Sequence, residues 1–126
     1  MDYTNPSIEE IKNWAYSNEK WPHDEWDLFL SWTRELDLFI ELATDQKCPK
    51  KVFFLHMLYY IVGTTFSEPT KTDKLNRIES YANKGRNSKH DDIKKWVSEV
   101  DLLLKGRKKY TYENWRGGLF ADYKFT

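Results

Sequence analysis

The sequence predicts an all-α fold, and three observations favour it. Ten of the eleven residues from 52 to 62 are apolar or aromatic and none is charged, so every face of that segment favours burial. Residues 28–43 repeat apolar side chains at the helical period, and capping residues or glycines mark the ends of most other segments. We therefore expect a single domain over residues 1–126. It would be a bundle of about five helices around a central apolar helix at about residues 50–65, with an aromatic C-terminal arm or small hairpin at 110–125.

The first two helices are expected at residues 7–18 and 23–44. In the first, Ser7 and Glu10 have the spacing of a capping box. Its expected buried face comprises Ile8, Ile11 and Ala15. In the second, seven apolar residues fall within an arc of about 120°, and the charged residues lie opposite. The charged side, which we expect to face water, comprises Asp27, Arg34, Asp37, Glu41 and Asp45.

The third helix is expected at residues 50–65, where Pro49 suits the first turn. A buried strand competes with this interpretation, because Val, Phe, Tyr and Ile all favour strands. The proline start, the length of the segment and the helical neighbours favour a helix.

The last two helices are expected at residues 72–84 and 89–105, after a loop at 67–70. Gly85 is expected to be the left-handed cap of the first, and Gly106 is expected to end the second. Ser88 and Asp91 have capping-box spacing at the start of the second. Leu102 points away from that helix's apolar stripe, so it is either exposed or covered by the tail.

The tail has two interpretations. Gly117 and Gly118 separate two aromatic stretches, as in a β-hairpin, but a lone hairpin is marginal in water. The alternative, which we favour, is a short helical turn at 112–116 followed by an extended arm.

Composition restricts the class of protein. Cys48 is the only cysteine, which excludes an internal disulfide and suits a reducing compartment. The start of the sequence lacks signal-peptide features, and no apolar segment reaches the roughly 20 residues that a bilayer requires. We expect a cytoplasmic protein without a membrane partner or cofactor.

The charge is unevenly distributed along the chain. Residues 1–46 contain 11 acids and 3 bases, whereas residues 47–126 contain 9 acids and 17 bases. The two halves either neutralise each other within one fold or present separate charged surfaces. Opposite faces on one chain also allow a homodimer.

Our main hypothesis is a non-catalytic protein-interaction module, such as a small inhibitor or immunity-type protein that binds a basic partner. Four tryptophans lie in the first 32 residues, and exposed tryptophan is enriched at binding hot spots. An acidic helix face suits a basic partner. The predicted contact residues are Trp21, Trp26, Asp27, Asp37 and Glu41. The alternative is that Trp14, Trp21 and Trp26 pack together between the first two helices.

Signals for metal binding and catalysis are weak. His23 and Asp27 are four residues apart, but acids at a helix start also favour the helix dipole, so we predict no metal site. His56, inside the apolar run, is interpreted as a core histidine with hydrogen-bond partners. No serine, cysteine or aspartate is placed by the sequence to complete a nucleophilic set.

The alternative function is RNA binding or cleavage. The segment Arg86-Asn87-Ser88-Lys89-His90 resembles the Arg-x(4–6)-His signature of HEPN-type ribonucleases, although only three residues separate its arginine and histidine. The resemblance covers these five residues and the all-helical build. It implies catalytic roles for Arg86 and His90. Basic and aromatic residues suited to nucleic acid are Arg77, Lys84, Arg86, Lys89, Lys108 and Tyr110.

Overall fold

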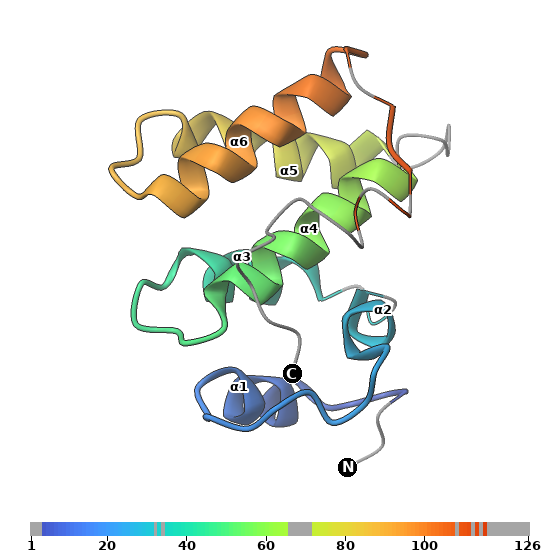
Figure 1. Cartoon of the computed structure of the whole chain (residues 1–126), viewed down its shortest axis with the longest axis vertical. Helices are drawn as coiled ribbons and strands as arrows, with labels where there is room; N and C mark the ends of the chain where they lie inside the picture. The colour runs from blue at the N-terminus through green and yellow to red at the C-terminus, as the bar shows by residue number, and fades with distance from the viewer. Residues whose placement is uncertain are drawn as a thin grey trace. The chain divides into compact units, whose positions relative to one another are not determined.

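The computed structural model describes residues 4–31, 33, 35–65, 72–107, 109–111, 113 and 115, without the side chains of residues 72, 74 and 75. This part of the chain contains six α-helices and no strand (Figure 1), which confirms the all-α prediction. It falls into two compact units. We call the part up to Met57 the N-terminal unit and the part from Leu58 the C-terminal unit. A single domain over residues 1–126 stays a prediction.

The N-terminal unit begins with α1 (Ile8–Ala15), which has the predicted capping box. Ser7 Oγ accepts a hydrogen bond from the Glu10 N–H at 3.1 Å, and Glu10 Oε1 accepts one from the Ser7 N–H at 3.0 Å. Ile11 and Ala15 are buried, as predicted. Ile8 is 47% exposed, so its assignment to the buried face is wrong. The buried part of this helix face begins at Ile11.

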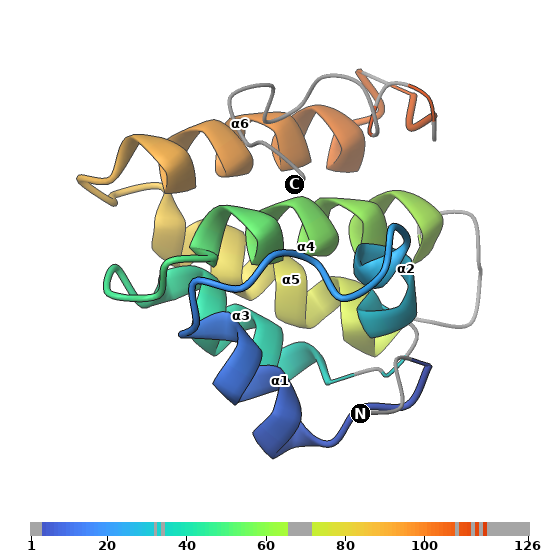
Figure 2. The same ribbon diagram turned by 60° about the horizontal axis from the view of Figure 1, so that its bottom comes forward.

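The segment predicted as one long helix over residues 23–44 is two helices, so that prediction is wrong. They are α2 (Trp26–Ser31) and α3 (Leu36–Thr44), and Figure 2 shows α2 and α3 as separate ribbons. Between them, Trp32 and Arg34 lie outside the described residues.

Local side-chain hydrogen bonds explain where α2 ends. The Ser31 hydroxyl donates to the Asp27 carbonyl at 2.7 Å, and the Thr33 hydroxyl donates to the Leu30 carbonyl at 2.7 Å. Bonds of this kind offer carbonyls a partner other than the next helical N–H, and they bend or end helices. Glu35, which precedes α3, has a non-helical ψ of 58°. The chain therefore changes direction before α3 begins.

The fourth helix, α4 (Lys51–Thr65), is the central apolar helix that the sequence predicts, and the strand alternative is wrong. From Phe53 to Tyr59, seven consecutive side chains are at most 3% exposed. Seven residues make almost two turns, so every face of this stretch is covered. Aromatic rings of the N-terminal unit pack on its first part, and they belong to Trp14, Trp21 and Phe39.

In the C-terminal unit, α5 (Thr72–Gly85) packs against α6 (Asp91–Leu104). Gly85 is the last residue of α5, so its predicted role as a left-handed cap is wrong. A Cβ at Gly85 would lie 2.8 Å from Val97 Cγ2 and 3.0 Å from Ile93 Cγ2. The glycine is needed because α6 approaches α5 closely at this point.

Only one end of α6 is capped as predicted. His90 is the N-cap residue, without a side-chain capping bond, and Ser88 Oγ accepts from the His90 N–H at 3.1 Å. The predicted capping box of Ser88 and Asp91 is therefore wrong. Gly106, with φ of +67°, ends the helix as predicted. Its N–H donates to Leu103, and the next N–H donates to Leu102, which together form a Schellman motif.

The described part of the tail packs on the C-terminal unit. A Cβ at Gly63 would lie 2.2 Å from Tyr110 Cδ2, so the Tyr110 ring rests directly on the α4 backbone. Trp115 is buried, and its ring lies 4.8 Å from that of Tyr60. The backbone N–H of Trp115 donates to the Thr111 carbonyl at 3.1 Å. That bond has the spacing of a helical turn. Leu102 is half-buried.

Two predicted segments lie outside the described residues: the loop at 67–70, and the hairpin or extended arm from residue 116 onward. None of the described helices has both the length and the apolar character needed to cross a membrane.

Candidate protein interface

The solvent-facing side of α3 is acidic. Five apolar residues of this helix are buried, whereas Asp37 and Glu41 are exposed. These two carboxylates are four residues apart and therefore lie on one face of the helix. The predicted amphipathic pattern is confirmed in this part of the chain.

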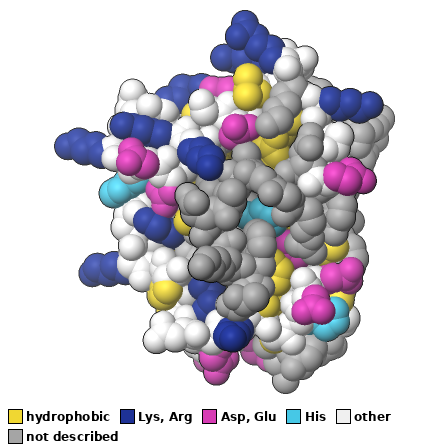
Figure 3. Space-filling view, viewed as in Figure 1, with side chains coloured by type: hydrophobic (Ala, Val, Ile, Leu, Met, Phe, Trp, Pro, Cys, Tyr) yellow, Lys and Arg dark blue, Asp and Glu magenta, His cyan; other side chains and the backbone are white. Residues whose placement is uncertain are grey.

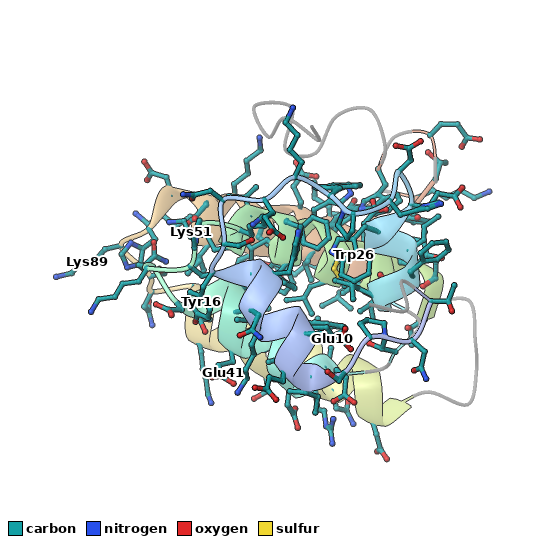
Figure 4. The ribbon with its side chains drawn as sticks, turned by 90° about the horizontal axis from the view of Figure 1, so that it is seen from below. Glu10, Tyr16, Trp26, Glu41, Lys51 and Lys89 are labelled. Atoms are coloured by element: carbon teal, nitrogen blue, oxygen red, sulfur yellow. The ribbon has the colours of Figure 1, made fainter. Side chains whose placement is uncertain are left out.

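Tyr16 extends this surface from the end of α1. It is 46% exposed, and its hydroxyl donates to Asp45 Oδ2 at 2.6 Å. That hydrogen bond, with smaller effects from burial and from nearby charges including Glu41, raises the pKa of Tyr16 to about 12. The same bond, with one from the Lys47 N–H, lowers the pKa of Asp45. At neutral pH the pair is therefore a phenol donating to a carboxylate. Figure 4 shows Tyr16 and Glu41 on neighbouring helices.

A buried lysine fixes the end of α1 that carries Tyr16. The Lys50 ammonium donates to the carbonyls of Trp14 and Ser17 at 2.8 and 2.6 Å, and it lies 4.4 Å from the centre of the Trp14 ring. Burial lowers the pKa of Lys50. A cation suits this position because the last carbonyls of a helix carry partial negative charge. Tyr16 is thus held through its backbone neighbours and through its own hydroxyl.

We call Tyr16, Asp37, Glu41 and Asp45 the acidic face. Two of the five predicted contact residues, Asp37 and Glu41, belong to it. Tyr16 was missed because nothing in the sequence shows that it lies beside Asp45. An aromatic residue at the end of a predicted amphipathic helix was the only available signal.

The other three predicted contact residues are not on this surface. Trp26 and Asp27 are fully buried, so the prediction that they face water is wrong. The reason is the break after α2, which separates these residues from the exposed side of α3. Trp21 is half-buried, with its ring 5.0 Å from that of Phe53. The rings of Trp14 and Trp26 are 5.7 Å apart, so these two tryptophans pack together as the alternative interpretation proposed, and Trp14 and Trp21 both pack on Phe53.

Asp27 forms a buried pair with His56. Asp27 Oδ2 lies 3.2 Å from His56 Nε2, and the two side chains are 0% and 1% exposed. Asp27 Oδ1 also accepts from the Leu28 N–H at 2.9 Å. Because neither group meets solvent, we assign the pair a structural role. This agrees with the interpretation of His56 as a partnered core histidine.

The predicted weakness of the metal signal has a structural reason. His23 is exposed, and its Nδ1 accepts from the Glu25 N–H at 3.1 Å, while the Asp27 carboxylate is buried against His56. Among the described residues, no group of three or more histidine, cysteine or acidic side chains is arranged to hold a metal ion.

The proposed RNA site is only partly assembled. Arg86 pairs with Asp101 through both terminal nitrogens, with Nη2 2.7 Å from Oδ1. These hydrogen bonds raise the pKa of Arg86. His90 is exposed at the start of α6. The Tyr110 ring packs on Gly63, so it is not presented as a stacking platform for bases. All four predicted bases within the described residues are exposed, namely Arg77, Lys84, Arg86 and Lys89, and Lys108 lies outside the described residues.

Comparison of the chain with family models, with curated proteins and with solved structures found no match.

Proposed function

We propose that this protein is a non-catalytic interaction module whose acidic face binds a basic surface on a protein partner. One observation carries the proposal: an exposed tyrosine, Tyr16, is held by Asp45 within a surface of carboxylates. Tyrosine is enriched among the residues that dominate binding energy at interfaces. Because its hydroxyl is already bonded, the ring loses little conformational freedom when a partner covers it.

The carboxylates beside Tyr16 favour partners of opposite charge. Asp37 and Glu41 are exposed on the same helix face, one turn apart. Such charges steer a basic partner toward the surface and disfavour acidic competitors, and their main effect is on the association rate. More specifically, we propose a small inhibitor of the immunity type that binds and blocks a basic toxin.

Binding measurements on surface variants test the proposal. A partner captured from the source organism is purified and titrated calorimetrically against wild type, Tyr16→Ala and Glu41→Lys. We expect Tyr16→Ala to weaken the Kd by about tenfold or more. We expect Glu41→Lys to slow association, with a smaller effect at high salt.

Two controls make the test specific. Glu79→Lys makes the same charge change at an exposed position of α5, and it should leave binding unchanged. Tyr16→Phe keeps the ring and loses only the bond to Asp45, so it should bind better than Tyr16→Ala. A stoichiometric partner whose Kd is the same for wild type, Tyr16→Ala and Glu41→Lys would contradict the proposal.

A further inference from the structure

We infer that the partner of the acidic face contributes an amphipathic helix, which packs along α1 over Ile8, Lys12 and Tyr16. We call these three residues the α1 stripe. The inference rests on the proposed function, because it names the kind of partner that Tyr16 meets. It adds the chemistry of that partner: two apolar residues on one helix face, a carboxylate between them and basic residues on either side.

The α1 stripe contains the two large apolar or aromatic side chains that are exposed among the described residues. They are Ile8 and Tyr16, at 47% and 46%. Apolar residues scattered singly over a surface need no explanation, but these two are aligned. They are eight positions apart, so they are separated by about 80° around the helix and about 12 Å along it. They therefore lie on one side of α1, next to its buried face, which at Ala15 is about 20° from Ile8.

The spacing of the α1 stripe favours a helix as the occupant. Apolar residues seven positions apart on a helix lie on one face and are separated by about 10.5 Å along its axis, close to the spacing of Ile8 and Tyr16. An extended strand could span the same distance, but a strand binds by pairing with the edge of a sheet. The described residues contain no strand, so they offer no such edge.

The charges along α1 specify the charges of the partner. Lys12 is exposed midway along the α1 stripe, and Glu9 is exposed beside it at the end that carries Ile8. Figure 3 accordingly shows basic and acidic side chains together on the part of the surface that α1 forms. A partner helix is complementary when a carboxylate lies opposite Lys12 and a basic residue lies opposite Glu9.

The end of the stripe that carries Tyr16 is also bordered by a carboxylate. Asp45 accepts the hydrogen bond of Tyr16, and the charge of Lys47 acts on Asp45, so the opposite charges of these two residues offset each other. Glu41 is exposed one turn earlier on α3. The bond to Asp45 and, less strongly, the charge of Glu41 raise the pKa of Tyr16, so Glu41 lies close to this end. A second basic residue of the partner is therefore expected opposite Glu41.

A second copy of this chain does not fit the α1 stripe. In a two-fold pairing of antiparallel α1 helices, Ile8 of each copy would meet Tyr16 of the other, and the two Lys12 side chains would face each other at the centre. Like charges in direct opposition disfavour such a contact. The occupant is therefore a helix of a different protein.

An NMR titration with a designed peptide is the first test. The probe is an alanine-based helical peptide of about 20 residues. It has two leucines seven positions apart, a glutamate midway between them and arginines on both sides of the leucine face. We expect it to shift the amide signals of α1 and to bind about fivefold more tightly than the same peptide with both leucines replaced by alanine. Unchanged α1 signals at about 1 mM peptide overturn the inference.

Charge exchange at Lys12 is the second test. Wild-type protein should prefer the glutamate peptide over its glutamate-to-lysine version by about threefold, and Lys12→Glu should reverse the preference. Ile8→Ala should weaken binding by about threefold or more, because it removes apolar contact area. Asn13→Ala is the matched control, since it is exposed on the same helix about 140° from Ile8, and it should bind as wild type does. A preference that Lys12→Glu leaves unchanged overturns the inference.

The captured partner separates this inference from the proposed function. If Ile8→Ala and Lys12→Glu leave its Kd unchanged, the inference fails. The proposed function still stands in that case, provided that Tyr16→Ala and Glu41→Lys weaken the binding. Sedimentation velocity tests the remaining occupant: self-association of the wild-type protein that Ile8→Ala abolishes would identify a second copy on the α1 stripe and would overturn the inference.

Discussion

The buried Asp27–His56 pair is the most informative place to perturb the N-terminal unit. Asp27→Ala removes the carboxylate and leaves the imidazole, and His56→Leu removes the imidazole and leaves the carboxylate. The double variant removes both groups and roughly conserves the summed side-chain volume. Together with wild type, these variants form a double-mutant cycle that isolates the interaction between the two residues.

The structure sets the expected magnitudes. The two side chains are 0% and 1% exposed and lie 3.2 Å apart, so neither can exchange its partner for water. Removing one member leaves a buried polar group without this partner, which costs about 1–3 kcal/mol and more for a charged group. That is a measurable part of the roughly 5–15 kcal/mol that stabilises a typical domain. The double variant should lose much less, because replacing a whole buried pair by apolar groups is often close to neutral. Its remaining loss is about 1 kcal/mol for the bond between Asp27 and the Leu28 N–H.

Urea unfolding monitored by tryptophan fluorescence and circular dichroism gives the four free energies of unfolding. Glu41→Ala, at an exposed position of α3, is the control and should change stability by no more than about 0.5 kcal/mol. We expect each single variant to be less stable than the double variant. If the single losses simply add in the double variant, or if each is below about 1 kcal/mol, the reasoning that the pair is one energetic unit is refuted.

Three further predictions follow from single contacts. The hydrogen bond from Tyr16 to Asp45 raises the pKa of Tyr16 from 10.0 to about 12. The stability that this bond gives the folded protein is therefore complete below pH 10 and is lost as the pH rises through 12. Asp45→Asn should lower the pKa of Tyr16, measured as the difference in tyrosinate absorbance between this protein and its Tyr16→Phe variant. Gly63→Ala should destabilise the C-terminal unit despite the better helix propensity of alanine, because its Cβ would lie 2.2 Å from the Tyr110 ring; thermal unfolding no lower than that of wild type would contradict this contact. Tyr81→Phe should leave stability unchanged or raise it by up to about 1 kcal/mol, because the buried Tyr81 hydroxyl has no hydrogen-bond partner among the described residues; a loss of stability on urea unfolding would reveal a partner.

Helices whose ends depend on local chemistry were predictable from the sequence. The capping box of α1 requires only Ser7 and Glu10 at the right spacing, and the end of α6 requires only a glycine that accepts positive φ. The apolar run in α4 was also predictable, because a segment without a polar face has to be covered on all sides. These signals lie within a few residues of the feature that they specify.

Features that neither the apolar period nor the residue type distinguishes were not predictable. The apolar period continues through residues 23–44, and nothing in that period shows that Ser31 and Thr33 bond to backbone carbonyls. Gly85 suits a helix cap by sequence, but its actual role comes from the close approach of Val97 on another helix. A composition pattern cannot distinguish a glycine needed for a turn from one needed for packing.

The location of the acidic face follows from the break after α2 and from the contacts that hold Tyr16. A continuous helix over residues 23–44 would have carried Asp27, Asp37 and Glu41 along one solvent-facing stripe. The break after α2 instead buries Asp27 against His56, so the exposed carboxylates are confined to α3 and its end. Tyr16 joins them only because Lys50 fixes the last turn of α1 and Asp45 holds its hydroxyl. The surface that we propose for partner binding is therefore a product of tertiary contacts, and substitutions that loosen those contacts should weaken binding without changing a single exposed charge.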